Sequence, residues 1–228
     1  MVLNNSRIVY FALLLIAFVA LFFSLRQGQS DLKMHALHQD IQRTKHSIAS
    51  RSLSLEDDLL KEQIERILAQ SENPQYMYSI ANFYAWLSYV AKVQLGKDKL
   101  GSTYSEKAYQ LNEKSRALRP FDSAIYSALA KDAWRLGKDR VIIENWLNIA
   151  QKQGPYERVT SLTSVEYYLA HWPTLSREQQ KKAVSYLLEM DDFNLNEGDF
   201  WSILTQPVLK SRFCSIMMFN AQKFDACQ

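Results

Sequence analysis

The chain has 228 residues, of which 47% are hydrophobic and 22% charged, with a net charge of +3. This is the composition of ordinary globular material with one core. The mild charge and the scattered Lys and Arg argue against nucleic acid as a partner. The six glycines form neither GxGxxG nor GxxxxGK[ST], which excludes the common nucleotide-binding loops.

An uninterrupted apolar run, flanked by arginines, extends from Ile8 to Leu25. As a helix it would reach about 27 Å, close to a hydrocarbon core of roughly 30 Å. A secretory signal has a shorter apolar core that ends in small residues, whereas Phe22, Phe23 and Leu25 stand here. We therefore expect residues 1–28 to be a short tail and an uncleaved transmembrane anchor.

The orientation of this anchor is predicted from its layout. Lys and Arg are too evenly divided between the two sides to give a strong bias. A very short tail before a single span is the usual layout of a signal anchor whose tail stays in the cytoplasm. We expect a single-pass protein of a bacterial inner membrane, held by residues 8–25, with its soluble domain in the periplasm.

Residues 29–53 are polar and are predicted to form a stalk, either a weak helix or a flexible spacer. Three histidines lie in it, and His35 and His38 would share one helix face, so a metal pair is conceivable. A third ligand at good spacing is missing from the stretch. A solvated stalk explains the histidines, and we predict neither a metal site nor a cofactor.

Residues 54–228 are predicted to be all-α, because segments rich in Ala, Leu, Glu and Lys dominate and β-branched alternation is scarce. Ser54-x-x-Asp57 resembles a capping box, and Asn73-Pro74 should start a central helix that runs to Gly96. Later caps are predicted at Thr103-x-x-Glu106, Asp122 or Ser123, Ser176-x-x-Gln179 and Asn194-x-x-Glu197. The helices between should cover 103–119, 124–136, 140–153, 157–172 and 178–190, and Pro207 should kink or split the last segment.

One helical pair has a known period, since Pro120 and Pro155 are about 35 residues apart and a tetratricopeptide repeat has 34. Tyr126-x-x-Leu129-Ala130-x-x-Ala133 stands where that repeat has W-x-x-L-G-x-x-Y. We therefore expect a degenerate tetratricopeptide-like α-solenoid after the single transmembrane helix. Its tryptophans should be core wedges, namely Trp134, Trp146 and Trp172. Its concave surface, made by the first helices, should present Tyr126, Lys131, Arg135 and Tyr167.

Two cysteines, Cys214 and Cys227, lie near the end of the chain. A bridge between them would close a short loop and would require an oxidising compartment. Two unpaired thiols are the alternative. We find no HExxH, GxSxG or paired CxxC and no carboxylate pair that suggests a glycosidase, so we expect no catalytic residues and no enzymatic activity.

A more specific resemblance covers residues 117–190. Arg119-Pro120, the run from Gly154 to Val159, and Trp172 with Leu175 carry it. The segment resembles the VpsP-type proteins of bacterial exopolysaccharide loci, which are small membrane-anchored proteins with a related helical-repeat region. Tyr156 departs from the expected Trp, and Phe121-Asp122 from an aromatic-rich stretch. Helical repeats attached to O-antigen polymerases and ligases are similar.

The resemblance implies a scaffold in exopolysaccharide biosynthesis or export. Its expected partners are protein components of a polysaccharide assembly machine. Two alternatives remain open from the sequence. One is a cell-envelope adaptor with no polysaccharide role, and the other is a protein that binds or modifies the glycan itself.

Overall fold

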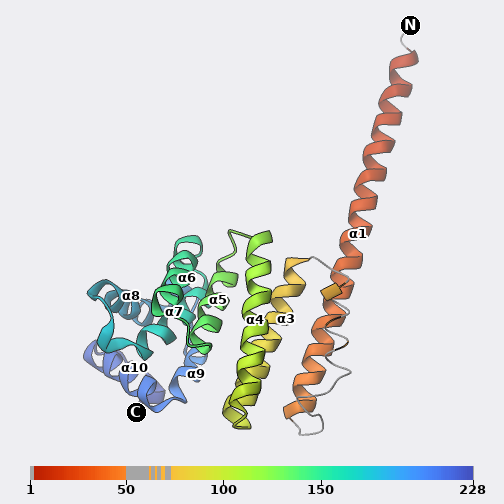
Figure 1. The fold of residues 1–228 in the computed structure, drawn as a ribbon. Coiled ribbons are helices and arrows are strands. Elements are labelled where there is room, and N and C mark those ends of the chain that lie inside the picture. Colours follow the sequence, from red (N-terminus) through yellow and green to blue (C-terminus); the bar gives the residue numbers. More distant parts are fainter. Residues whose placement is uncertain (1–2, 50–61, 63–64, 66–67, 70–72, 228) are drawn as a thin grey trace. The chain divides into compact units, whose positions relative to one another are not determined.

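A computed structural model describes residues 3–49, 62, 65, 68–69 and 73–227 of the chain (Figure 1). The structure is all-α, and no strand occurs among these residues. The chain divides into two compact units, Met1–Gln63 and Ile64–Gln228. The predicted capping box at Ser54 and Asp57 lies outside the described residues.

The first unit contains α1 (Leu3–Ala49), a continuous helix that includes the predicted anchor. Within it lies a helical stretch long and apolar enough to cross a membrane. The sequence left open whether residues 29–53 form a weak helix or a flexible spacer. The helix continues through this polar stretch as far as Ala49, with intrahelical side-chain contacts such as Gln39 to His35 at 3.0 Å.

The second unit opens with α3 (Pro74–Tyr89), which continues as the π-helical turn η1 (Val90–Gln94). As predicted, Asn73 caps α3: its side-chain oxygen accepts a hydrogen bond from the Gln75 amide at 2.9 Å. Pro74 occupies the first helical position, where no donor is lost. Gly96 follows η1 with φ of 64°, a left-handed conformation that glycine adopts without strain.

The next helix, α4 (Asp98–Leu118), corrects a prediction, because its cap is Lys97 and not Thr103. Thr103 lies inside the helix, and its hydroxyl donates to the Lys99 carbonyl at 3.1 Å. A threonine in a helix interior can bond the preceding turn in this way, so the S/T-x-x-E pattern alone does not mark a start. The helix ends at Leu118 with Arg119 as its cap, immediately before Pro120 and close to the predicted end.

Two helices match the predicted repeat pair closely. Asp122 caps α5 (Ser123–Arg135), accepting from the Ala124 amide at 3.0 Å, and α6 (Arg140–Gln153) has the predicted bounds. Gly154 ends α6 at a close approach. A Cβ added there would lie 2.4 Å from the Ser123 hydroxyl oxygen, so only glycine fits.

The remaining helices are shorter. They are α7 (Arg158–Ala170), η2 (Trp172–Thr174), α8 (Arg177–Leu188), η3 (Met190–Phe193), η4 (Glu197–Phe200), α9 (Trp201–Leu204), α10 (Pro207–Phe219) and η5 (Asp225–Cys227). The capping box of Ser176 and Gln179 is present as predicted. Pro207 does split the last segment, because it begins α10. The predicted cap at Asn194 is wrong: Asn196 forms the box with Asp199, and Asn194 ends η3 in a left-handed conformation.

Helices of the second unit follow a repeating contact pattern (Figure 1). The pairs α3–α4, α5–α6 and α7–α8 each pack together. We call α3, α5 and α7 the first helices of these pairs and α4, α6 and α8 the second helices. Each first helix also packs on the next one, α3 on α5 and α5 on α7, and α7 packs on α10. Small polar side chains permit close contacts between helices, as where the hydroxyls of Ser127 on α5 and Thr160 on α7 lie 3.1 Å apart and buried. The core is rich in aromatic rings, among them the fully buried Tyr168, Tyr186 and Phe213.

Candidate functional site: a groove between α8 and α10

The two tyrosines predicted for a ligand-facing surface are in the core, which corrects that prediction. Tyr126 is 5% exposed and Tyr167 is 1% exposed. The Tyr126 ring contacts Trp146 at 5.8 Å between centroids, and its hydroxyl donates to the Pro120 carbonyl at 2.9 Å. Both rings fill the space where one helix packs on the next, so neither can stack on a ligand.

The two predicted cations are partly exposed, but each is paired within the fold. Lys131 on α5 donates to Glu166 on α7 at 2.6 Å, and Arg135 donates to Asp132 at 3.0 Å. The first ion pair connects α5 to α7, and the second lies within α5. The four predicted residues therefore do not form one ligand-binding surface, because burial removes the rings and internal carboxylates neutralise the charges.

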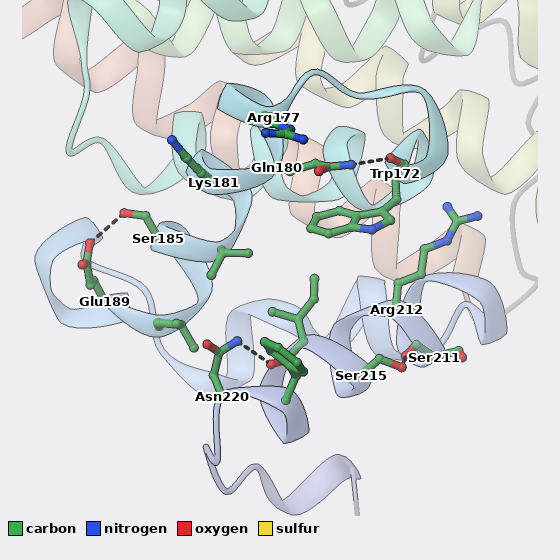
Figure 2. Close-up of a pocket in the computed structure, with 14 residues that line it drawn as sticks. Trp172, Arg177, Gln180, Lys181, Ser185, Glu189, Ser211, Arg212, Ser215 and Asn220 are labelled. Carbon is green, nitrogen blue, oxygen red and sulfur yellow. Dashed lines mark hydrogen bonds between the residues drawn. The ribbon is translucent and has the colours of Figure 1, made fainter.

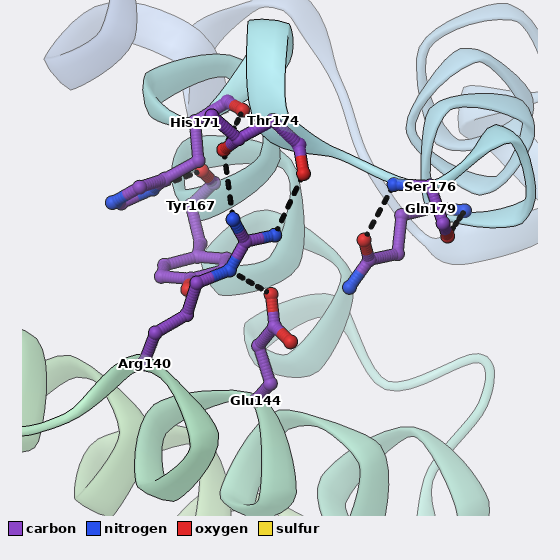
Figure 3. Close-up of polar contacts among 7 residues, drawn as sticks. All are labelled: Arg140, Glu144, Tyr167, His171, Thr174, Ser176 and Gln179. Atoms are coloured by element: carbon purple, nitrogen blue, oxygen red, sulfur yellow. Dashed lines mark hydrogen bonds and ion pairs between the residues drawn. The ribbon is translucent and has the colours of Figure 1, made fainter.

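A polar cluster beside Tyr167 serves the fold rather than a ligand (Figure 3). Arg140, at the start of α6, donates to the Glu144 carboxylate at 2.7 Å, to the Thr174 hydroxyl at 2.8 Å and to the Thr174 carbonyl at 3.0 Å. Tyr167 stacks on the His171 ring at 4.3 Å. Burial raises the pKa of Tyr167 to about 12, so its hydroxyl stays protonated. The cluster ties α6 to the turn after α7.

The buried carboxylate of Asp132 on α5 is also engaged. It accepts a hydrogen bond from the Asn112 amide at 2.9 Å and one from Arg135 at 3.0 Å. Burial raises its pKa to about 6. The residue is 1% exposed, which leaves no access for a substrate. Asp132 therefore holds α4 against α5.

The metal reading of the stalk histidines gains no support. The side chains of His35 and His38 lie within hydrogen-bonding distance of Gln39 and Gln42, four residues further along α1. In the part of the chain that the structure describes, no three His, Cys, Asp or Glu side chains are grouped to hold a metal ion.

An open groove of about 870 Å³ lies between α8 and α10 in the second unit (Figure 2). Trp172 of η2 lies at one end, next to Arg212 of α10. Its lining is Trp172, Arg177, Gln180, Lys181, Val184, Ser185, Leu188, Glu189, Ser211, Arg212, Ser215, Ile216, Phe219 and Asn220. The lining combines apolar side chains, such as Val184, Leu188 and Phe219, with polar and charged ones.

Charges are unevenly distributed along this groove. Arg177 and Lys181 occupy the first turns of α8, whereas Glu189 follows its last residue and accepts from the Ser185 hydroxyl at 2.6 Å. Arg212 lies inside the groove wall and donates to the Leu169 and Ala170 carbonyls, so it caps the end of α7. The cations that face solvent are therefore those at the start of α8.

Cys214 and Cys227 form a disulfide, with their Cα atoms 5.4 Å apart. Of the two alternatives that the sequence left open, the structure therefore has the bridge. Cys214 is two positions from Arg212 and from Ile216, which places it on roughly the opposite side of α10 from the groove. Phe224, which precedes the bridge, packs on Phe213 with centroids 4.8 Å apart. The bridge holds the segment after α10 against the core and away from the groove.

Sequence reasoning missed the groove. Its residues were assigned to two ordinary helices, and neither helix alone shows which of its faces stays uncovered. The tryptophans placed in the core are all partly buried and packed against it, and Trp172 also borders the groove. Phe219, which is 91% exposed, marks the groove most clearly. Its exposure depends on the tertiary structure, so the sequence alone could not show it.

No family model, curated protein or solved structure matches this chain.

Proposed function

We propose that the chain is a membrane-anchored helical-repeat scaffold that takes part in bacterial exopolysaccharide biosynthesis or export. It acts through protein–protein contacts in the periplasm. The observation that carries the docking role is the α8–α10 groove, in which apolar side chains are exposed between charged edges. Exposed apolar area of this kind is characteristic of a binding surface.

The anchor supports the same proposal. The apolar helix within α1 is suited to holding a soluble unit at a membrane. A tethered scaffold gathers its partners at the membrane surface, where exported polymers are assembled. The polysaccharide role itself rests on the resemblance of residues 117–190 to VpsP-type proteins.

A second candidate function is direct contact with the polymer. Three aromatic side chains outside the core favour it, since Phe121 is 85% exposed, Tyr156 66% and Trp201 73%. Flat rings can stack on the apolar faces of sugars. Tyr156 also stacks on Phe193 at 5.9 Å, which holds its ring in place.

Gene deletion followed by complementation tests the proposed function. We expect deletion in the source bacterium to lower the amount of exported polymer, and the full chain to restore it. A version without residues 1–28, exported through a cleaved signal, should fail. So should Phe219→Asp, which places a charge in the groove, whereas Val141→Asp, at another exposed apolar position, on α6, should restore the polymer.

Two results would contradict the proposal. Unchanged polymer after deletion would remove the polysaccharide role. If Phe121→Ala and Tyr156→Ala abolished binding of the purified polymer while Phe219→Asp had no effect, the chain would be a glycan-binding protein instead.

A further inference from the structure

Both walls of the groove are built from single faces of helices. On α8 the lining residues recur at intervals of three and four, from Arg177 through Lys181 and Val184 to Leu188. On α10 Ser215 and Phe219 have the same relation. Residues at these intervals share one side of a helix. Two helices thus each present one stripe of residues to the same space, into which a third helix can pack.

The contact pattern of the second unit indicates what belongs in that space. Each first helix packs on the first helix of the next pair, and each second helix packs on that same neighbour. Thus α5 contacts α3 and α4, α7 contacts α5 and α6, and α10 contacts α7 and α8. By its contacts α10 occupies the position of the first helix of a fourth pair.

The earlier first helices α3, α5 and α7 are each covered by a second helix, namely α4, α6 and α8. In the described chain after α10, the only helical segment is the short η5, which the disulfide ties back to α10. The groove leaves exposed a face of α10 that carries Phe219, and among the described residues α10 has no second helix of its own packed on it.

We infer that the groove binds one amphipathic α-helix of a partner protein, which packs on α10 as the second helix of each earlier pair packs on its first helix. The inference names the partner chemistry of the docking surface and so rests on the proposed function. The partner helix supplies apolar side chains at positions i, i+3, i+4 and i+7, which cover Trp172, Val184 and Phe219. This is the helix-in-groove mode of recognition.

Charge sets the direction of the bound helix. Arg177 and Lys181 lie at the start of α8, and Glu189 lies just after its end. The ion pair of Lys181 with Glu178 is exposed on both sides, at 75% and 83%, and competes weakly with a partner. A helix with Asp or Glu in its first turn and Lys or Arg in its last is therefore complementary when it lies parallel to α8.

A defined peptide tests the inference on the full chain in lipid nanodiscs. The probe is a fluorescein-labelled helix of about 16 residues, with leucines at the stated spacing, glutamates in its first turn and lysines in its last. We expect saturable binding by anisotropy at micromolar concentration, and no binding of a scrambled peptide of the same composition. Phe219→Asp should weaken binding at least tenfold. Val141→Asp, which lies outside the groove, should leave it unchanged.

A charge exchange tests the direction. The double variant Arg177→Glu and Lys181→Glu should weaken binding at least tenfold, and a peptide with its terminal charges reversed should recover it. Lys114→Glu with Lys152→Glu, two exposed lysines on α4 and α6, is the matched control and should bind like the wild type. Circular dichroism shows whether each variant keeps its helices.

Several outcomes would overturn the inference. They are equal binding of the scrambled peptide, binding that is insensitive to Phe219→Asp, and no recovery by the charge-reversed peptide. Self-association of the wild type that Phe219→Asp abolishes would assign the groove to a second copy. Peptide binding together with unchanged polymer after gene deletion would leave this inference standing while the proposed polysaccharide role fails.

Discussion

Single buried polar residues connect the helices of the second unit, and Asp132 is the clearest example. Its carboxylate accepts one hydrogen bond from Asn112 of α4 and one from Arg135 of its own helix. A buried carboxylate is costly to ionise even when it is hydrogen-bonded. The contact between α4 and α5 is therefore sensitive to proton concentration.

We predict that the protonation of Asp132 makes the stability of the second unit depend on pH. Its pKa is about 6 in the folded chain, against an ordinary value of 3.8 for an aspartate, so the folded state binds the proton more tightly. The resulting stabilisation is complete below pH 3.8 and is lost as pH rises through about 6. Relative to Asp132→Asn, wild-type residues 64–228 should lose about 3 kcal/mol of unfolding free energy between pH 3.5 and 7. Urea titrations that gave parallel pH profiles for the two proteins would contradict this.

Trp146 shows how one aromatic side chain connects three helices. From α6 its ring contacts Tyr126 of α5, and its indole nitrogen donates to the Tyr109 hydroxyl of α4 at 3.4 Å. Arg116 lies over the ring, with its guanidinium carbon 5.3 Å from the centroid. The sequence predicted burial within its own pair, but the ring is only partly buried and also reaches the preceding pair.

We predict that Trp146→Ala destabilises the domain by about 3 kcal/mol, because it removes an aromatic packed against the core. Thermal or urea unfolding of residues 64–228 measures the loss. Trp146→Phe, which keeps a ring, should lose less. Lys152→Ala, at an exposed position of the same helix, should stay within about 0.5 kcal/mol of the wild type. Equal stability of Trp146→Ala and wild type would show that the ring contributes no packing.

At the scale of the element, the last helix depends on a covalent constraint. α10 begins at Pro207 and ends at Phe219, and Cys214 at its middle is bridged to Cys227 of η5. The bridge limits the conformations of the intervening segment in the unfolded chain. It thereby favours the folded position of α10, which forms one wall of the groove.

We predict that loss of this bridge costs about 3 kcal/mol, the loop-entropy value for a closed loop of about 14 residues. Cys214→Ser with Cys227→Ser should lower the unfolding free energy by this amount and weaken binding of the helical peptide. Non-reducing peptide mass spectrometry on the full chain isolated from cells should recover the two cysteines linked. If both were freely alkylated, the bridge would be absent in the cell.

At the scale of the whole molecule, an apolar N-terminal helix precedes a helical unit with a groove between α8 and α10. The function proposed for it needs both parts on the same chain, since the anchor fixes where the groove acts. The side of the membrane on which the second unit lies therefore decides which partners it can meet.

The proposed function requires a periplasmic groove, so we predict that the C-terminus lies outside the cytoplasm. Alkaline phosphatase fused after Gln228 should be active, and green fluorescent protein fused there should be dark. Carbonate extraction should leave the full chain in the membrane fraction. The reverse fusion pattern would place the groove in the cytoplasm and remove periplasmic partners from the proposal.

The sequence by itself determined the helical class, the apolar N-terminal helix and many helix ends. These follow from local chemistry: Asn73 and Asp122 cap because their side chains reach the next free amides, and Pro207 starts a helix because it lacks a donor. Where more than one residue could cap a helix, the local pattern gave the wrong cap. Thr103 bonds back inside α4, and the cap expected at Asn194 is made by Asn196 instead.

The tertiary structure alone decided which surface is free. When α5 and α7 are considered separately, Tyr126 and Tyr167 are predicted to lie on the surface. Packing of the neighbouring helices buries both. Phe219 reads as an ordinary apolar residue of α10, yet it borders the groove between α10 and α8. The face of a helix that stays exposed depends on contacts between segments far apart in the chain, and those contacts have no local signature in the sequence.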